Sequence, residues 1–173
     1  MKGRLIVSGI LVWLALVPGA TAQDRFDQRL ADQIAASVRN YTQFTIFDDV
    51  NGQVDDGVVV LTGKVTMPYK KADIERRVAR IDGVREVRSE ITVLPVSIFD
   101  DDLRHRVARA IYGSPSFWPY ASMANPPIHI IVENGRVTLT GVVQSNVERA
   151  LARSLATGWG EFAVNNELRT EMK

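Results

Sequence analysis

The sequence predicts an α+β protein of two tandem modules, each ordered helix, strand, strand, helix, strand. Each module is expected to form a small three-stranded mixed sheet with two helices on one face. Three observations lead to this class: an internal repeat, apolar residues at helical spacing, and a hairpin signature in the middle of each copy. The chain has 173 residues and no cysteine, so the fold depends on no disulfide.

The repeat is clearest in residues 56–65 and 134–143, which align at a constant offset of 78. The match continues on both sides with small changes of offset, which indicates that insertions fall in loops between the elements. Its further members are the pairs Leu30 and Leu103, Ile34 and Val107, Val38 and Ile111, Ile74 and Leu151, Val78 and Leu155, and Gly83 and Gly160.

Each copy opens with a segment whose apolar residues recur at spacing four, which predicts an amphipathic helix. Asp27 precedes the first of these helices, and the run Asp100 to Asp102 precedes the second. Acidic side chains are favourable at a helix N-terminus, so we interpret this run as helix capping in preference to a cation site.

A hairpin follows in each copy. The dipeptides Asp56-Gly57 and Asn134-Gly135 suit a two-residue type I′ turn, whose central residues need positive φ. Gly63 and Gly141, farther along each second strand, are interpreted as structural glycines of a turn or bulge.

A second helix and a last strand complete each copy. The second helices are expected to bury three apolar residues each, and a right-handed crossover then places the last strand parallel to the hairpin. Modules of about 70 residues are near the lower limit for an independent core, so we expect the two to pack together. The expected helix residues are Ile74, Val78 and Ile81 in the first copy, and Val147, Leu151 and Leu155 in the second.

The first 22 residues are typical of a secretory signal peptide, with Lys2 and Arg4 before an apolar stretch and Ala20-Thr21-Ala22 at the cleavage site. The apolar stretch is too short for a membrane span, so no transmembrane anchor is expected after cleavage. The expected division is a signal peptide at 1–22, one module at 23–94, a linker at 95–99 and a second module at 100–173. The protein is therefore expected to be periplasmic or otherwise extracytoplasmic.

Charge and composition exclude several functions. The chain carries 21 basic and 20 acidic residues, and cleavage would remove two basic ones, so the mature protein is close to neutral. Neutrality argues against nucleic-acid binding, which needs a basic excess. His105 and His129 stand apart without a ligand spacing, and no nucleophile elbow or phosphate loop is present. We therefore expect no metal, no cofactor and no enzymatic activity.

The repeated hairpin motif, followed by a helix and by Gly83-Val84-Arg85-Glu86-Val87, resembles the BON domain (bacterial OsmY and nodulation). The second copy departs from this pattern at Gly160-Glu161-Phe162-Ala163-Val164. The resemblance covers essentially the whole mature chain, in the tandem arrangement typical of OsmY-like periplasmic proteins. It implies a module linked to phospholipid surfaces, envelope integrity and osmotic or other stress, and it brings no catalytic residue.

The loop before Ile128 is the first candidate contact surface, since it holds Phe117, Trp118, Tyr120 and Met123. Trp and Tyr favour apolar–polar boundaries, so this loop could enter a lipid headgroup layer or anchor a protein partner. The alternative is that its rings fold back over the small core or fill the seam between the modules. The first copy has a milder equivalent in Tyr41, Phe44, Ile46 and Phe47.

A basic bias between residues 64 and 88 is the second candidate surface. Such a face could bind anionic phospholipid. The alternative is a solvent-exposed helix face with ordinary ion pairs, which would have the same sequence pattern. The leading hypothesis is thus association with an anionic phospholipid surface, and the alternative is an adaptor that docks onto an envelope protein. The candidate cations are Lys70, Lys71, Arg76, Arg77 and Arg80.

Overall fold

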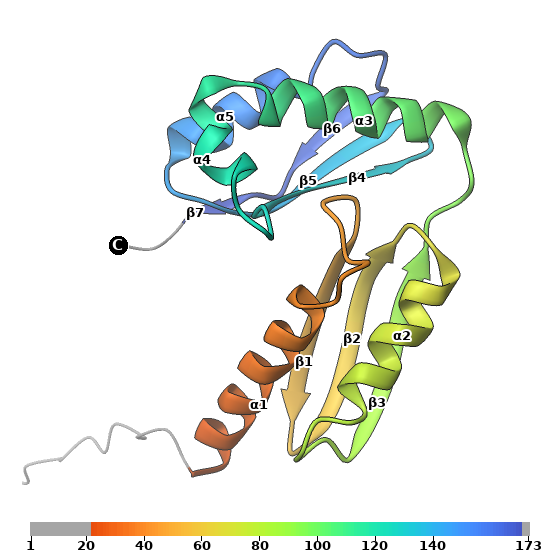
Figure 1. Cartoon of the computed structure of the whole chain (residues 1–173), viewed down its shortest axis with the longest axis vertical. Helices are drawn as coiled ribbons and strands as arrows, with labels where there is room; N and C mark the ends of the chain where they lie inside the picture. Colours follow the sequence, from red (N-terminus) through yellow and green to blue (C-terminus); the bar gives the residue numbers. More distant parts are fainter. Residues whose placement is uncertain (1–21, 171–173) are drawn as a thin grey trace, which may run out of the picture.

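The computed structural model describes residues 22–170, so the expected signal peptide lies outside the described residues except for Ala22. Two modules follow one another along the chain (Figure 1). The first comprises α1 (Ala22–Arg39), β1 (Asp49–Asp55), β2 (Val58–Val65), α2 (Pro68–Val78) and β3 (Glu86–Val93). The second comprises α3 (Ile98–Tyr112), a 3-10 turn (Pro115–Phe117), α4 (Trp118–Ala121), β4 (Ile128–Glu133), β5 (Arg136–Val143), α5 (Asn146–Leu155), β6 (Ala163–Asn166) and β7 (Arg169–Thr170).

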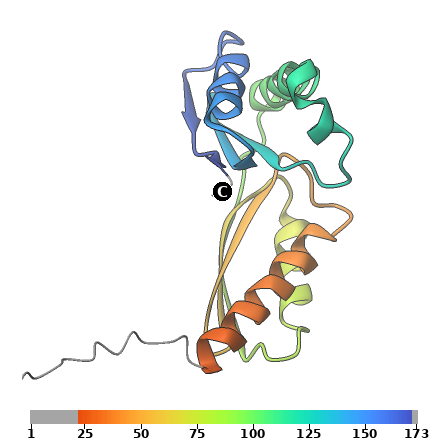
Figure 2. The ribbon, with the colours of Figure 1, turned by 90° about the vertical axis from the view of Figure 1, so that its left-hand side faces the viewer.

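The sheet of the first module has the order β1-β2-β3, with β2 antiparallel to β1 and parallel to β3. The helices α1 and α2 lie together on one side of this sheet (Figure 2). The expected α+β class of two tandem modules with small mixed sheets is confirmed.

The second module differs in its last strand. On the side of β5 away from β4, β6 pairs with Arg136–Leu139 and β7 with Val142–Val143, so the single strand expected there is divided in two. Between β6 and β7 the backbone stays beside β5, because the amide of Glu167 donates a hydrogen bond to the carbonyl of Leu139 at 2.8 Å. Leu168, at the break, is buried in the core.

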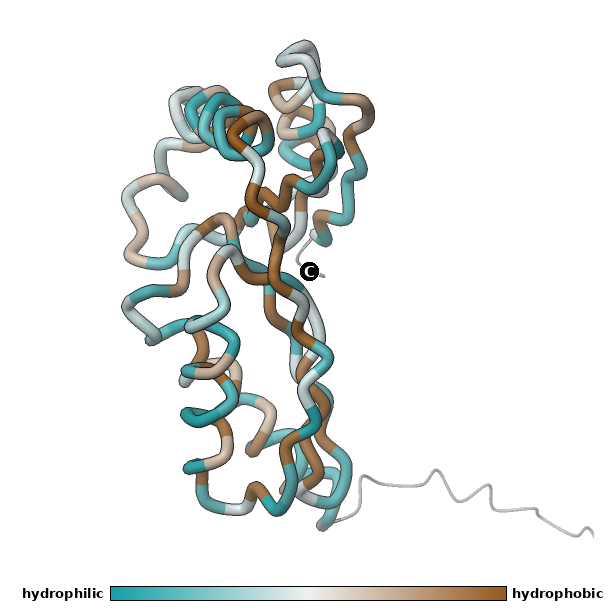
Figure 3. Tube along the Cα trace, turned by 90° about the vertical axis from the view of Figure 1, so that its right-hand side faces the viewer, coloured by the Kyte–Doolittle hydropathy of each residue, from teal (hydrophilic) through white to brown (hydrophobic). Residues whose placement is uncertain are grey.

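Each module has its own hydrophobic core between the sheet and the helices. The alternation predicted for the second strand of each hairpin is observed, with Val59, Leu61, Val137 and Leu139 fully buried. Figure 3 shows the apolar residues concentrated along the strands. The first core consists of Leu30, Ile34, Val38, Tyr41, Val59, Leu61, Val65, Ile74, Val78 and Ile91.

The hairpin turns have the conformation that their sequences indicate. Asp56 and Gly57 have φ of 46° and 74°, and Asn134 and Gly135 have φ of 51° and 72°, as a type I′ turn requires. Asp27 and Asp100, expected before the first helix of each module, lie within α1 and α3, where each holds the hairpin turn of its module. Asp100 accepts hydrogen bonds from the amides of Asn134 (2.8 Å) and Gly135 (2.7 Å), while Asp27 accepts one from the amide of Asp56 (3.2 Å).

The expectation that Asp100 to Asp102 cap α3 is therefore wrong in part. Its N-cap is Ser97, whose hydroxyl accepts from the amide of Asp100 at 3.1 Å. Asp100 instead ties the start of α3 to the β4–β5 turn, and Asp102 forms an ion pair with Arg106. The run is structural, but most of its role is to join elements and not to cap one.

Gly63 and Gly141 lie at equivalent positions in β2 and β5, with φ of 123° and 111°. A Cβ at Gly63 would collide with the backbone carbonyl of Asp49 in β1, and one at Gly141 with that of Pro127, just before β4. Only glycine fits where the backbones approach so closely.

The two modules pack through the loop 40–48 of the first module, which reaches the β4 edge of the second (Figure 1). The side chains of Ile46 and Phe47 pack against the core of the second module. The amide of Ile130 donates to the carbonyl of Ile46 at 2.7 Å, and Lys64 forms an ion pair with Glu133 across the junction. The expected packing of one copy on the other is thus made by the first copy's aromatic loop.

Candidate contact surfaces

The aromatic loop of the second module divides into buried and exposed residues. Phe117 is fully buried, and its ring stacks on Tyr120 at a centroid distance of 6.0 Å. The Tyr120 hydroxyl donates to Glu148 on α5 at 2.7 Å and accepts from the amide of Gln144 at 3.0 Å. A surface role for Phe117 and Tyr120 is therefore wrong, because both fold back over the core.

Trp118 and Met123 are the exposed members of this loop, with 61% and 46% of their surface accessible. Trp118 begins α4, and the bond from Tyr120 to Glu148 fixes α4 against the start of α5. The loop therefore presents one aromatic ring and one thioether to solvent from a well-anchored base.

Lys70 does not belong to the cationic surface, which corrects the expectation for this residue. It is 4% exposed, and its ammonium donates to Asp48 at 2.6 Å and to the hydroxyl of Thr66 at 2.8 Å. Asp48 is fully buried and also accepts from the amides and hydroxyls of Thr45 and Thr66. A buried ammonium needs such a partner, so Lys70 is a structural cation of the first module.

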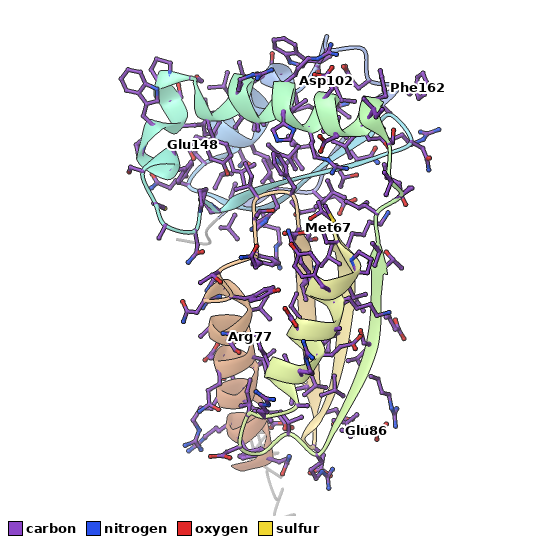
Figure 4. All side chains as sticks on the ribbon, turned by 45° about the vertical axis from the view of Figure 1, so that its right-hand side comes forward. Met67, Arg77, Glu86, Asp102, Glu148 and Phe162 are labelled. Atoms are coloured by element: carbon purple, nitrogen blue, oxygen red, sulfur yellow. The ribbon has the colours of Figure 1, made fainter. Side chains whose placement is uncertain are left out.

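The remaining candidate cations, on α2 and in the turn after it, reach the surface. Arg76, Arg77 and Arg80 are exposed, and Lys71 is half-buried. Tyr69 and Met67 are exposed at the N-terminal end of the same helix. Figure 4 shows Met67 at the end of α2 that is nearer the second module and Arg77 farther along. The solvent side of α2 thus has an apolar end followed by a cationic stretch.

Asp73 on α2 is an acid beside this stretch, and it forms an ion pair and a hydrogen bond within the module. It accepts from the Tyr41 hydroxyl at 2.6 Å and forms an ion pair with Arg76. These bonds from Tyr41 and Arg76 hold the pKa of Asp73 below its ordinary value. Burial, together with the bond to Asp73, raises the pKa of Tyr41 to about 12, so the phenol stays protonated. The guanidinium of Arg77 lies over the Tyr41 ring at 5.4 Å.

The second module presents a similar face on α5, which the sequence reasoning missed. Arg149 and Arg153 are exposed there, and Val147 at the N-terminal end is 76% exposed. The expectation that Val147 lies in the core is therefore wrong, because Ala152 and Ala156 fill the core and turn Val147 outward. The spacing of four between Arg149 and Arg153 is a sequence signal that could have found this face.

We call these two regions the second-helix faces. The α2 face consists of Met67, Tyr69, Lys71, Arg76, Arg77 and Arg80, and the α5 face consists of Val147, Arg149 and Arg153. Arg76 and Arg153 occupy equivalent positions at the offset of 77 that relates the two helices.

The histidines contribute to the junction of the modules. The ring of His105 meets Phe47 edge-on at 4.9 Å, and the ring of His129 lies 5.5 Å from that of Phe44. Among residues 22–170 the structure holds no group of three or more side chains suited to bind a metal ion. Within the same range, no helix combines the length and the apolar character needed to cross a bilayer.

The fold defines a class of protein: two tandem small α+β modules, each with a small mixed sheet. Two matches to the BON domain model, at residues 26–95 and 100–172, show that the chain belongs to the BON domain family. BON domains are in general non-catalytic and bind phospholipids or mediate protein interactions.

Comparison with curated protein sequences finds no significant match. Two solved structures of CdsD, a structural protein of the Type III secretion system of Chlamydia trachomatis, are similar over most of this chain. One shares 15% identity over 84% of this chain and 64% of that chain, with a TM-score of 0.33. The other, its C-terminal domain, shares 13% identity over 85% of this chain and 67% of that chain, with a TM-score of 0.34. The chain thus spans about two thirds of the length of these structures.

Proposed function

We propose that the chain is an exported envelope protein that associates reversibly with anionic phospholipid surfaces through its two second-helix faces. Its role would be envelope maintenance or tolerance of osmotic and other stress. The observation that carries the proposal is the repetition of one kind of face, cationic with an apolar end, on α2 and again on α5.

The charges on these faces suit weak, reversible binding. A cation near an anionic membrane contributes about 1 kcal/mol, and the exposed arginines are Arg76, Arg77, Arg80, Arg149 and Arg153. Two of the acids beside them are engaged within the protein, since Asp73 is bonded to Arg76 and Tyr41, and Glu148 to Tyr120. Over residues 71–80 the four cations Lys71, Arg76, Arg77 and Arg80 outnumber the two acids Asp73 and Glu75, so this region keeps a net positive charge.

The apolar ends of the faces would add to this attraction. Tyr69 and Met67 on α2, and Val147 on α5, are exposed at the N-terminal ends of their helices. Amphipathic side chains such as Tyr sit favourably at the level of lipid headgroups. Shallow insertion of these residues would distinguish lipid association from simple attraction to any anionic surface.

Charge reversal at the two equivalent arginines tests the proposal. Arg76→Glu and Arg153→Glu are each expected to weaken co-sedimentation with anionic phospholipid vesicles by about fivefold at low salt, and the double variant by about 30-fold. The wild-type chain should bind anionic vesicles and leave zwitterionic vesicles unbound.

Arg88→Glu is the matched control, because it makes the same charge change on β3. Arg88 is exposed and pairs with Glu86 on the sheet face that no helix covers. The control should bind nearly as well as the wild type. Equal losses in the control and in the second-helix variants, or no wild-type binding at low salt, would exclude the proposal.

A further inference from the structure

At the junction between the modules, a loop of one module binds to the edge of the other. The loop 40–48 of the first module lies across the edge formed by α3 and β4. Its Ile46 carbonyl accepts from the amide of Ile130, and its Phe47 ring meets His105 on α3. One backbone hydrogen bond at the strand edge and one ring on the helix are thus among the interactions that form the contact.

The first module has the equivalent edge, formed by α1 and β1. Ile130 pairs with Leu139 across the β4–β5 hairpin, and Gly52 pairs with the equivalent Leu61 across the β1–β2 hairpin. The amide of Gly52 therefore points away from β2, as the amide of Ile130 points away from β5. The equivalent of His105, at the offset of 73 between the first helices, is Asp32.

The two edges differ in what covers them. In β4, the amide of Ile130 is taken by the carbonyl of Ile46 in the docked loop, and Ile130 and Ile131 are both buried. In β1, the equivalent residues Gly52 and Gln53 are exposed, as is Asn51 before them. Within residues 22–170, the Gly52 amide donates to no backbone carbonyl outside its sheet. An exposed strand edge of this kind is a template for pairing with another chain.

A cavity of about 800 Å³ lies along this free edge. Its walls come from α1 and β1, with Ala35, Arg39 and Gly52 among the lining residues, and it continues to His129 and Thr140 of the second module. It therefore adjoins the established junction and has room for several side chains.

The loop of the second module that corresponds to the loop 40–48 has side chains exposed to solvent. Residues 113–127 contain no charged side chain and present Trp118 and Met123 to solvent. At the offset of 78 that relates β1 to β4, Ala124 and Asn125 take the places of Ile46 and Phe47. The chain thus has one loop docked and one exposed, and one edge covered and one open.

We propose that a second copy of this chain fills the open edge, inserting loop 113–127 of its second module against α1 and β1 of the first. The contact would repeat between chains the arrangement that joins the modules within one chain. Because the two surfaces are different, the contact is head to tail and extends into chains of molecules in preference to closed pairs. An uncharged loop implies that this association, unlike lipid binding, depends weakly on salt.

Intermolecular cross-linking tests the proposal, since the chain has no cysteine of its own. Asp32→Cys and Asn125→Cys reproduce the positions of His105 and Phe47, which are in contact at the junction. A mixture of the two variants of the full mature chain, oxidised without lipid, is expected to give a disulfide-linked pair. Either variant alone should give much less, as should Asn125→Cys mixed with Glu90→Cys, which places the thiol on the open face of β3.

Sedimentation velocity without lipid gives a second readout. The mean mass should rise with protein concentration, and Trp118→Ala should weaken this association by about tenfold, as loss of an aromatic anchor does. Arg76→Glu should leave it unchanged, so failure of the lipid proposal and failure of this one are distinguishable. A chain that stays monomeric at all concentrations, or cross-links of Asn125→Cys chiefly with itself, would overturn the proposal.

Discussion

Replacing Asp48 with alanine is expected to lower the free energy of unfolding by about 3 to 5 kcal/mol. The carboxylate is fully buried and accepts the ammonium of Lys70, itself buried, at 2.6 Å. Its removal leaves a charged group in the core without a counter-ion, and it also leaves the amides of Thr45 and Thr66 without their acceptor. Urea unfolding of the wild type and the variant at neutral pH measures the difference.

The stabilisation from Asp48 has a defined pH dependence. Burial raises the pKa of Asp48, but the hydrogen bonds from Lys70, Thr66 and Thr45 together outweigh burial and hold it below its ordinary value. A carboxyl whose folded pKa is depressed stabilises the fold above its unfolded pKa, about 3.9, and loses this stabilisation as the pH falls through the folded value. The difference between the wild type and Asp48→Ala should therefore be constant near neutrality and shrink below about pH 4.

A double variant separates the ion pair from a general loss of packing. Asp48→Ala with Lys70→Met removes both charges and should recover a substantial part of the stability, because an apolar pair avoids the cost of a buried unpaired ammonium. If the double variant is less stable than Asp48→Ala, then Lys70 is not the reason that Asp48 is needed.

Phe117→Ala is expected to lower the free energy of unfolding by about 3 to 5 kcal/mol, which is typical of a buried aromatic ring replaced by a methyl group. The ring is fully buried in the core of the second module and stacks on Tyr120. Its loss would also loosen α4, which the bond from Tyr120 to Glu148 holds against α5.

The neighbouring residue provides the matched comparison for Phe117. Trp118→Ala removes a larger ring that is 61% exposed, so its effect on stability should stay within about 0.5 kcal/mol at low protein concentration. Thermal unfolding monitored by circular dichroism measures both variants. A larger loss for Trp118→Ala than for Phe117→Ala would reverse the assignment of which ring belongs to the core.

Features with a local physical cause could be predicted from the sequence. The Asp56-Gly57 and Asn134-Gly135 turns follow from backbone preference, and the repeat of these turns in the sequence indicates two modules. The divided last strand of the second module could not be predicted, because the alternation of Val164 and Leu168 continues across the break.

The sequence also did not predict which side of the short helix α5 faces the core. The stripe through Val147, Leu151 and Leu155 has a regular spacing of four, but the inward stripe of α5 passes through Leu151, Ala152, Leu155 and Ala156. Alanine carries little weight in a hydrophobic pattern, although it packs well where a helix approaches a sheet closely. The exposed face with Arg149 and Arg153 was missed for this reason.

Some residues of each candidate surface are buried in the structure, and only the exposed ones can contact a partner. Burial depends on contacts between residues that are distant in sequence, so it could not be predicted. In the sequence, Lys70 is one of several basic residues. In the fold it meets Asp48, which precedes β1, whereas Lys70 follows β2. Phe117 and Trp118 are adjacent and chemically similar, yet one is enclosed and the other is free to contact a partner. The loop with Ile46 and Phe47 was noted as an equivalent of the second aromatic loop, but its place against β4 required the structure.

Single spin labels on the two second-helix faces would test the central claim most directly. Nitroxides at Ala72→Cys on α2 and Ala150→Cys on α5 occupy exposed positions beside the arginines, and Glu90→Cys places a label on the helix-free face of the first sheet. With anionic vesicles, the labels at 72 and 150 should become shielded from a water-soluble relaxation agent, while the label at 90 should stay fully accessible. Shielding at 90 with none at 72 and 150 would show that the membrane meets a different surface of the protein.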